Sequence, residues 1–128
     1  MVDTLGNLLE VVVHTACIQD RDGAMLVLYK LSDAIKAHLR LLWADGGYTG
    51  KLIDWIKEHI GTLVEIVEKD PTQQGFAVLP HRWVVERTFA WLNNHRRLSK
   101  DYERFTRTSE TIIQIAMMRL MLRRLKPL

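Results

Sequence analysis

Two acidic residues have the types and positions expected of metal ligands. Asp45 ends the apolar run 39–44 and is followed by Gly46 and Gly47, whereas Glu86 lies in the first turns of a helical segment. A carboxylate at a strand end and another on a later helix can converge on one Mg²⁺ ion, which prefers oxygen ligands. Such sites catalyse phosphoryl transfer, because the cations polarise the scissile phosphate and lower the pKa of the attacking water or hydroxyl. The pair therefore predicts metal-dependent phosphoryl transfer.

The neighbours of Glu86 fit a carboxylate that faces a polar cleft. Arg82 lies one turn before Glu86, and Ala90 and Asn93 lie one and two turns after it on the same helix face. The alternative is an ordinary surface salt bridge between Arg82 and Glu86, which are four residues apart. Acidic residues before glycine are also frequent in loops, so the interpretation depends on the two carboxylates together.

The elements that must position these residues alternate between strands and helices. We expect strands at 8–14, 39–44 and 63–67, a strand-like piece at 76–79, and helices at 22–37, 50–59, 80–94 and 109–125. Asp20 and Thr49 are the expected caps of the first two helices, and Thr108 or Ser109 that of the last. The strand at 39–44 is nearly all apolar, as expected when both of its faces are covered. This order predicts an α/β layered fold.

Composition limits the class of protein. The chain has 128 residues, of which 48% are hydrophobic and 26% charged, which is typical of one globular domain. The single cysteine, Cys17, excludes an internal disulfide and favours a reducing compartment. No secretory leader is visible, and the most apolar stretch, 112–122, is too short to span a bilayer. We therefore expect a cytoplasmic protein with no membrane partner.

Charge is distributed unevenly along the chain. Residues 1–80 contain 7 Lys or Arg against 11 Asp or Glu, whereas residues 81–128 contain 11 against 4. A basic segment attracts phosphate backbones, because binding releases condensed counterions. The segment after residue 80 therefore predicts contact with a polynucleotide; the alternative is a solvated helix surface.

Three stretches resemble bacterial insertion-sequence DDE transposases. They are residues 43–50, 80–92 and 96–103, and the resemblance extends from residue 2 to residue 120. The nearest likeness is to the group named after insertion sequence five, with a transposase domain similar to that of insertion sequence four. The resemblance implies an RNase H-like core that cuts and joins DNA at element ends, using Mg²⁺ or Mn²⁺ and three acidic residues.

Individual residues match the motifs of that family. Asp45 corresponds to the second acidic residue, Glu86 to the third, and Arg82 to the arginine of its Tyr, Arg, Glu, Lys signature. The sequence departs from the signature at Leu79, where tyrosine is expected, and at Asn93, where lysine is expected. The residues expected to contact DNA are Arg82, Asn93, Arg96, Arg97, Lys100 and Arg104.

The first acidic residue of the family would precede Val2. The resemblance therefore implies one domain, residues 1–128: a truncated RNase H-like core (strand-helix-strand-helix-strand-helix) without its opening strand and with an extra C-terminal helix. The chain is similar to the downstream frame of a transposase split over two frames, or to a remnant. We expect it to be the C-terminal catalytic portion of a DDE transposase that acts with an N-terminal portion. The alternative is a non-catalytic fragment that binds DNA or forms homo-oligomers. In either case the expected partner is the double-stranded DNA of insertion-sequence ends.

Overall fold

The protein divides into two compact units, which are described separately. One unit comprises Met1–Cys17 and Val84–Leu128, and the other Ile18–Trp83. The computed structural model describes residues 1–68, 71–72, 74–75 and 81–125. The strand-like piece expected at 76–79, Leu79 of the signature, and the expected helix start at residue 80 lie outside the described residues.

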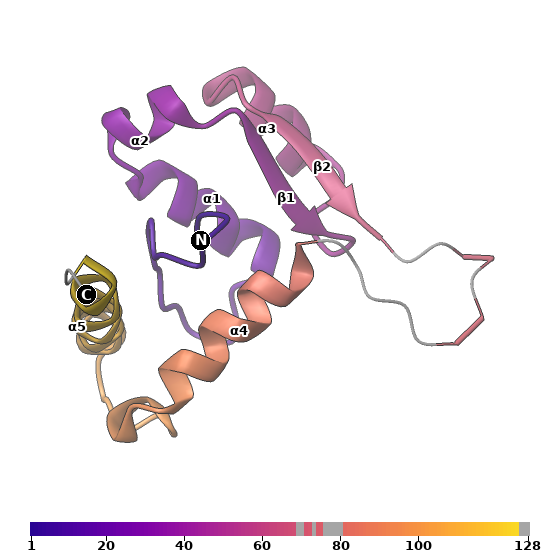
Figure 1. The fold of residues 1–128 in the computed structure, drawn as a ribbon. Helices are drawn as coiled ribbons and strands as arrows, with labels where there is room; N and C mark the ends of the chain where they lie inside the picture. Colours follow the sequence, from indigo (N-terminus) through magenta and orange to yellow (C-terminus); the bar gives the residue numbers. More distant parts are fainter. Residues whose placement is uncertain (69–70, 73, 76–80, 126–128) are drawn as a thin grey trace. The chain divides into compact units, whose positions relative to one another are not determined.

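The unit Ile18–Trp83 is built around a two-stranded parallel sheet (Figure 1). Its elements are α1 (Asp20–Lys30), α2 (Asp33–His38), β1 (Leu41–Asp45), α3 (Lys51–His59) and β2 (Leu63–Val67). β1 pairs with β2 so that Asp45 lies opposite Val67. α3 connects the two strands, and its side chains Leu52 and Ile56, one turn apart, are buried. The positions expected for both strands and for α3 are confirmed to within two residues.

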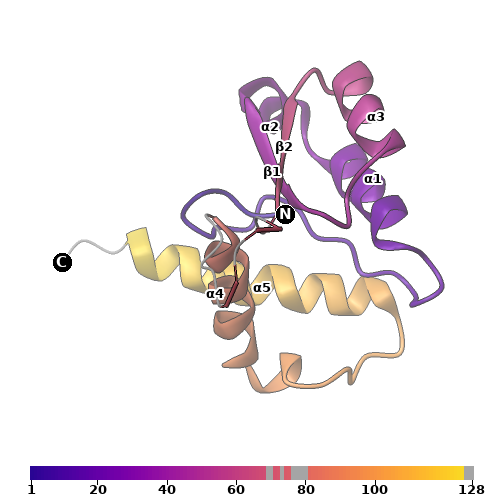
Figure 2. The same ribbon diagram turned by 90° about the vertical axis from the view of Figure 1, so that its right-hand side faces the viewer.

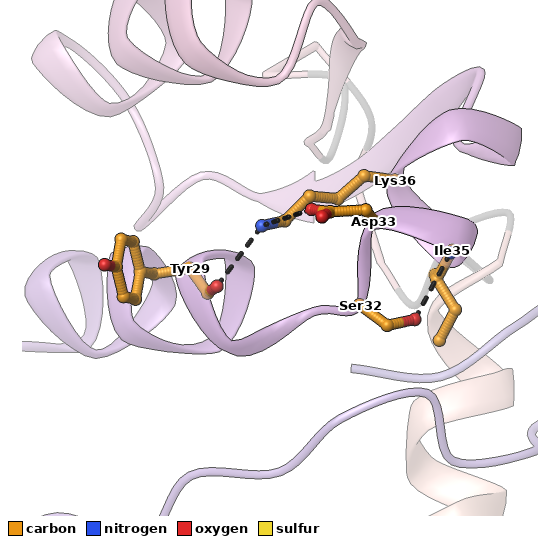
Figure 3. A network of polar contacts seen from close by, with 5 residues as sticks. All are labelled: Tyr29, Ser32, Asp33, Ile35 and Lys36. Carbon is orange, nitrogen blue, oxygen red and sulfur yellow. Dashed lines mark hydrogen bonds and ion pairs between the residues drawn. The ribbon is translucent and has the colours of Figure 1, made fainter.

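The helix expected at 22–37 forms as two helices, α1 and α2. Leu31 has an extended backbone, and the Ser32 hydroxyl accepts a hydrogen bond from the Ile35 amide at 3.4 Å, so Ser32 caps α2 (Figure 3). Lys36 joins the two helices: its ammonium donates to the Tyr29 carbonyl at 3.3 Å and lies 3.8 Å from the Asp33 carboxylate. A serine cap inside an apolar helical pattern therefore ends the first helix early.

The caps expected for the helices at 22–37, 50–59 and 109–125 are all wrong. Gln19 occupies the cap position of α1, and Asp20 is the first helical residue, where its charge favours the helix N-terminus. Gly50, with a φ of 76°, occupies the cap position of α3 in place of Thr49. The last helix, α5 (Thr106–Leu125), starts earlier than expected, so Thr108 and Ser109 lie inside its first turn.

The strands are less covered than their apolar sequences suggested. No residue of β1 or β2 is buried, and Leu41 and Leu63 at their starts are 37% and 67% exposed. α3 packs along one side of the strands (Figure 2). The expectation that both faces of the strand at 39–44 are covered is wrong for the described residues of this unit, where each strand has one neighbour.

The unit of Met1–Cys17 and Val84–Leu128 is mainly helical. α4 (Arg82–Asn93) begins two residues before it, and η1 (Arg96–Leu98) and α5 (Thr106–Leu125) follow. Val84 and Thr88, one turn apart on α4, are buried, as are Ala116 and Met117 of α5. The two helices therefore each contribute one narrow buried stripe to the core of this unit.

The strand expected at 8–14 does not form. The described residues there contain one isolated antiparallel bridge, between Val2 and Leu8. The backbone amides find other acceptors: Leu9 donates to the Met1 carbonyl at 3.1 Å, and Val13 donates to the Glu110 carboxylate of α5 at 2.9 Å. Backbone amides of this apolar, β-branched run thus find acceptors on Met1 and on Glu110 of α5 instead of on a neighbouring strand.

Residues 3–7 form a tight turn. The Asp3 carboxylate accepts hydrogen bonds from the Leu5 and Asn7 amides at 2.9 and 2.8 Å, and Gly6 has a φ of 81°. Gly6 also packs closely on α4, because a Cβ there would lie 2.9 Å from the Trp91 ring. Glycine is required at this position both for its backbone conformation and for the approach of the ring.

The described residues form a mixed α/β protein with a two-stranded parallel sheet and five α-helices. The α/β class is confirmed. The RNase H-like core remains an expectation.

Candidate active site

Asp45 lies at the carboxyl end of β1, where the chain turns toward α3. The Gly47 amide donates to Asp45 Oδ1 at 3.0 Å, and the Tyr48 amide donates to the Asp45 carbonyl at 3.0 Å. Asp45 is exposed. The turn therefore fixes the carboxylate at the sheet edge while leaving it accessible to solvent.

A second carboxylate, that of Glu68, lies at the same end of the sheet. Glu68 directly follows β2, and a Cβ built on Gly46 would lie 2.9 Å from Glu68 Oε1. Gly46 thus provides space for an acidic side chain, and its φ is outside the left-handed region. Sequence analysis missed Glu68, although the first residue after a parallel strand is a position where functional side chains gather.

The pKa of Tyr48 is sensitive to the negative charge of nearby carboxylates, including Asp45. Burial raises the pKa of the Tyr48 hydroxyl, and the carboxylates of Asp20 and Asp45 raise it further. Asp20, at the start of α1, is therefore close enough to Tyr48 to affect its pKa. The carboxyl end of β1 thus carries the carboxylate of Asp45, with Glu68 beside Gly46.

Asp45→Asn should lower the pKa of Tyr48. The neutral amide removes one of the negative charges that oppose ionisation of the hydroxyl, while burial and Asp20 continue to raise the pKa. Ultraviolet absorbance titration measures tyrosinate formation, and Tyr48→Phe identifies which of the three tyrosines gives the shifted transition. An unchanged Tyr48 transition in Asp45→Asn would show that the two groups do not interact.

His81, which directly precedes α4, contacts the strand that carries Asp45. The His81 and Trp43 rings stack with centroids 3.9 Å apart and planes 11° from parallel, and the Trp43 indole donates to Glu65 at 3.0 Å. His81 has a φ of 65°, a strained value for a residue with a side chain. The stack therefore holds an unfavourable backbone conformation at the start of α4.

Glu86 lies on the exposed face of α4. Arg82, Glu86, Ala90 and Asn93 are all exposed, whereas Val84 and Thr88 are buried. The helix itself is confirmed, and the polar cleft expected beside Glu86 stays a prediction. Asp45 and Glu86 belong to different units, so their convergence on one metal ion stays a prediction.

The basic residues expected to contact DNA gather around the end of α4. Arg96 and Arg97 lie in η1, and Lys100 and Arg104 follow it; all four are exposed. Arg97 donates a hydrogen bond to Glu103, which offsets its charge. Asn93 ends α4, while Arg82 begins it in the other unit. Arg96, Lys100 and Arg104 are therefore the stronger candidates of this segment.

The donor chemistry fits a hard divalent cation, but the described residues supply an incomplete ligand set. Asp45 and Glu86 offer the carboxylate oxygens that Mg²⁺ prefers. Among residues 1–68, 71–72, 74–75 and 81–125, no group of three or more His, Cys, Asp or Glu is close enough to hold a metal ion. Metal binding by Asp45 and Glu86 therefore stays a prediction.

Comparison with protein families identifies the class of protein. Residues 42–123 match the transposase DDE domain family. This segment contains Asp45, Glu86 and all of the candidate DNA contacts. The chain belongs to the family of transposase DDE domains.

A curated protein named as a transposase is similar to part of the chain. Over 65 residues the chain is 37% identical to a Burkholderia cepacia protein named "Putative transposase for insertion sequence element IS402". The matched segment covers 51% of the chain and 30% of that relative, so the chain matches about a third of the relative's length. No solved structure matches the chain. In the part of the chain that is described, no helix combines the length and apolar character needed to cross a bilayer.

Proposed function

We propose that this chain contributes Asp45 and Glu86 to the active site of a DDE transposase that cuts and joins insertion-sequence ends by Mg²⁺-dependent phosphoryl transfer. The observation that carries the proposal is the family match over residues 42–123, which includes both carboxylates in their expected motifs. The relative named as a transposase for an insertion sequence supports the same assignment.

Two of the stretches that resemble the family, residues 43–50 and 80–92, are in contact through the rings of Trp43 and His81. His81 stacks on Trp43, so the chain segment that enters α4 is attached to the strand that ends at Asp45. Trp43 precedes Asp45 by two residues, and His81 precedes Glu86 by five.

The chain's own residues would hold the ions and the DNA. Mg²⁺, or Mn²⁺, would polarise the scissile phosphate and acidify the attacking water or 3′-hydroxyl when bound. Asp45, oriented by the Gly47 amide, and Glu86, on the exposed face of α4, would supply ligands. A third carboxylate would come from an N-terminal portion of the transposase. Arg82, Asn93, Arg96, Arg97, Lys100 and Arg104 would contact the DNA backbone.

The finer assignments follow the same proposal. We place the protein in the group named after insertion sequence five, with an RNase H-like core formed by residues 1–128 and the missing opening strand. We infer that it acts in the cytoplasm, where chromosomal DNA and reduced cysteine are found together. Association with a second copy would bring two DNA ends together.

The proposal is tested by strand cleavage of element-end DNA. The protein should be produced in its longest translated form, including residues encoded in frame or by frameshifting ahead of Met1. We expect cleavage with Mg²⁺ and none with a chelator. DNA binding without Mg²⁺-dependent cleavage would favour the alternative function, a DNA-binding or dimerising fragment that regulates a complete transposase.

A further inference from the structure

An open cavity lies beside the start of α5. Its volume is about 510 Å³, and it is lined by Phe105, Arg107, Thr108, Thr111 and Ile112. All five residues belong to the unit that contains α5, and they occupy its first two turns and the position directly before it. The volume lies in the range of cavities that hold small organic ligands. We call it the Phe105 cavity.

The aromatic ring of this cavity is accessible and has a cation beside it. Phe105 is 65% exposed, and the Arg104 guanidinium carbon lies 5.6 Å from the centroid of its ring. The Phe105 backbone is fixed, because its carbonyl accepts hydrogen bonds from the Thr108 and Ser109 amides at 3.0 and 3.3 Å. The start of α5 therefore presents an ordered aromatic surface next to a positive charge, an arrangement that is itself favourable.

The other lining residues supply polar groups around the ring. Arg107 is exposed and carries a planar set of N–H donors that matches phosphate oxygens. The Thr111 hydroxyl donates to the Arg107 carbonyl at 2.9 Å, so its oxygen can still accept a hydrogen bond. The exposed Thr108 adds a second hydroxyl. A ring, a cation and two hydroxyls together can contact the base and the phosphate of a nucleotide.

Positive charge predominates in the segment that forms the cavity. Residues 96–112 contain five Lys or Arg against three Asp or Glu, a net charge of +2. Two of the acidic side chains are engaged within the protein, since Glu103 pairs with Arg97 and the Glu110 carboxylate accepts from the Val13 amide. The segment therefore favours an anionic ligand.

We propose that the Phe105 cavity binds an unpaired base of single-stranded DNA. The inference rests on the proposed function, which supplies DNA as the ligand. Exposed aromatic rings among basic residues are typical of surfaces that bind single strands, where bases stack on the rings and cations contact the phosphates. Tyr102, three residues before Phe105, is 58% exposed and adds a second ring to the basic segment. Bases inside a duplex are covered by their neighbours, so a ring can stack only on a base that has left the duplex.

Binding to a single strand and to a duplex, both in chelator, tests the inference. The chain should be titrated by fluorescence anisotropy with a labelled oligothymidylate of about 16 nucleotides and with a mixed-sequence duplex of the same length. Phe105→Leu keeps an apolar side chain and removes the ring. We expect it to weaken single-strand binding about fivefold or more and duplex binding less than about twofold. Its salt dependence should not change, whereas Arg107→Gln should reduce the slope of log K against log salt by about 0.7, as for one lost phosphate contact.

Tyr29 provides the matched control. It is 78% exposed, and the Lys36 ammonium lies 6.0 Å from the centroid of its ring, but both residues belong to the other unit. Tyr29→Leu should therefore bind oligothymidylate within about twofold of the wild type. A second measurement applies if Phe105→Leu does not fold by circular dichroism. In Phe105→Trp, oligothymidylate should quench the emission of the added indole, and the duplex should not.

Three results would overturn the inference. They are equal losses of single-strand and duplex binding in Phe105→Leu, an equal single-strand loss in Tyr29→Leu, and quenching in Phe105→Trp no greater than in the wild type. Tighter binding of an oligouridylate of the same length would assign the cavity to RNA and would also overturn it. Because these assays use no metal and no element-end sequence, they can fail while Mg²⁺-dependent cleavage by Asp45 and Glu86 stands.

Discussion

Asp45→Asn and Glu86→Gln should each reduce Mg²⁺-dependent strand cleavage by the complete transposase by roughly 10²- to 10⁴-fold. Each substitution keeps the size of the side chain and removes an anionic ligand, and metal ions contribute several kcal/mol to transition-state stabilisation in such sites. Rates of single-turnover cleavage of a labelled element end measure the effect. The double variant should lose little more than either single variant, because residues that act as one unit are not additive.

Matched controls come from α3. Asp54→Asn and Glu58→Gln remove carboxylates from exposed positions of that helix and should leave the cleavage rate within about twofold. Binding of DNA in chelator should also be retained by Asp45→Asn and Glu86→Gln. Cleavage at the wild-type rate in either of these two variants would refute the proposed roles.

Met117→Ala should cost the unit that contains α5 roughly 2–5 kcal/mol of its free energy of unfolding. Met117 is 1% exposed and is one of the two most deeply buried large side chains among the described residues. Its truncation removes contacts with the core and leaves a cavity, which adjacent helices fill only in part. Urea unfolding followed by circular dichroism measures the change.

The neighbouring Met118 provides the control. Met118 is 57% exposed on the same helix, so Met118→Ala makes the same chemical change with an expected effect below about 0.5 kcal/mol. Similar losses for the two variants would show that the buried stripe of α5 is assigned incorrectly.

The sequence predicted the β1–α3–β2 region well because local signals agree there. β2 occupies residues 63–67 as expected, and α3 buries Leu52 and Ile56 at helical spacing between a glycine at each end. Gly61, with a φ of 72°, follows the helix, as glycine commonly does at a helix C-terminus. Periodicity and glycine placement were sufficient in this region.

Other elements depend on contacts that a local pattern does not contain. Residues 8–14 have strand-forming side chains, but their amides are satisfied by partners such as Glu110, which lies about a hundred positions away. The helix expected at 22–37 forms as two helices because the Ser32 side chain caps a new helix. Its hydrogen bond to the Ile35 amide competes with continuation of the first helix.

Part of the candidate site could be recognised from residue types alone. The positions of Asp45 at a strand end and of Glu86 in the first turns of a helix were predicted correctly, whereas the polar cleft expected beside Glu86 stays a prediction. Glu68 and Asp20 were not placed beside Asp45, because their proximity follows from strand register and from the packing of α1. The convergence of the two carboxylates depends on long-range assembly, which residue spacing does not specify.

Metal-directed backbone cleavage tests most directly whether Asp45 and Glu86 share one metal pocket. Fe²⁺ can replace Mg²⁺ among oxygen ligands, and with ascorbate and peroxide it cuts the polypeptide beside the bound ion. For the complete transposase we predict cuts near both residues, suppressed by excess Mg²⁺ and both lost in Asp45→Asn and in Glu86→Gln. Cuts near one residue alone, or a variant that loses one cut and retains the other, would contradict the shared site.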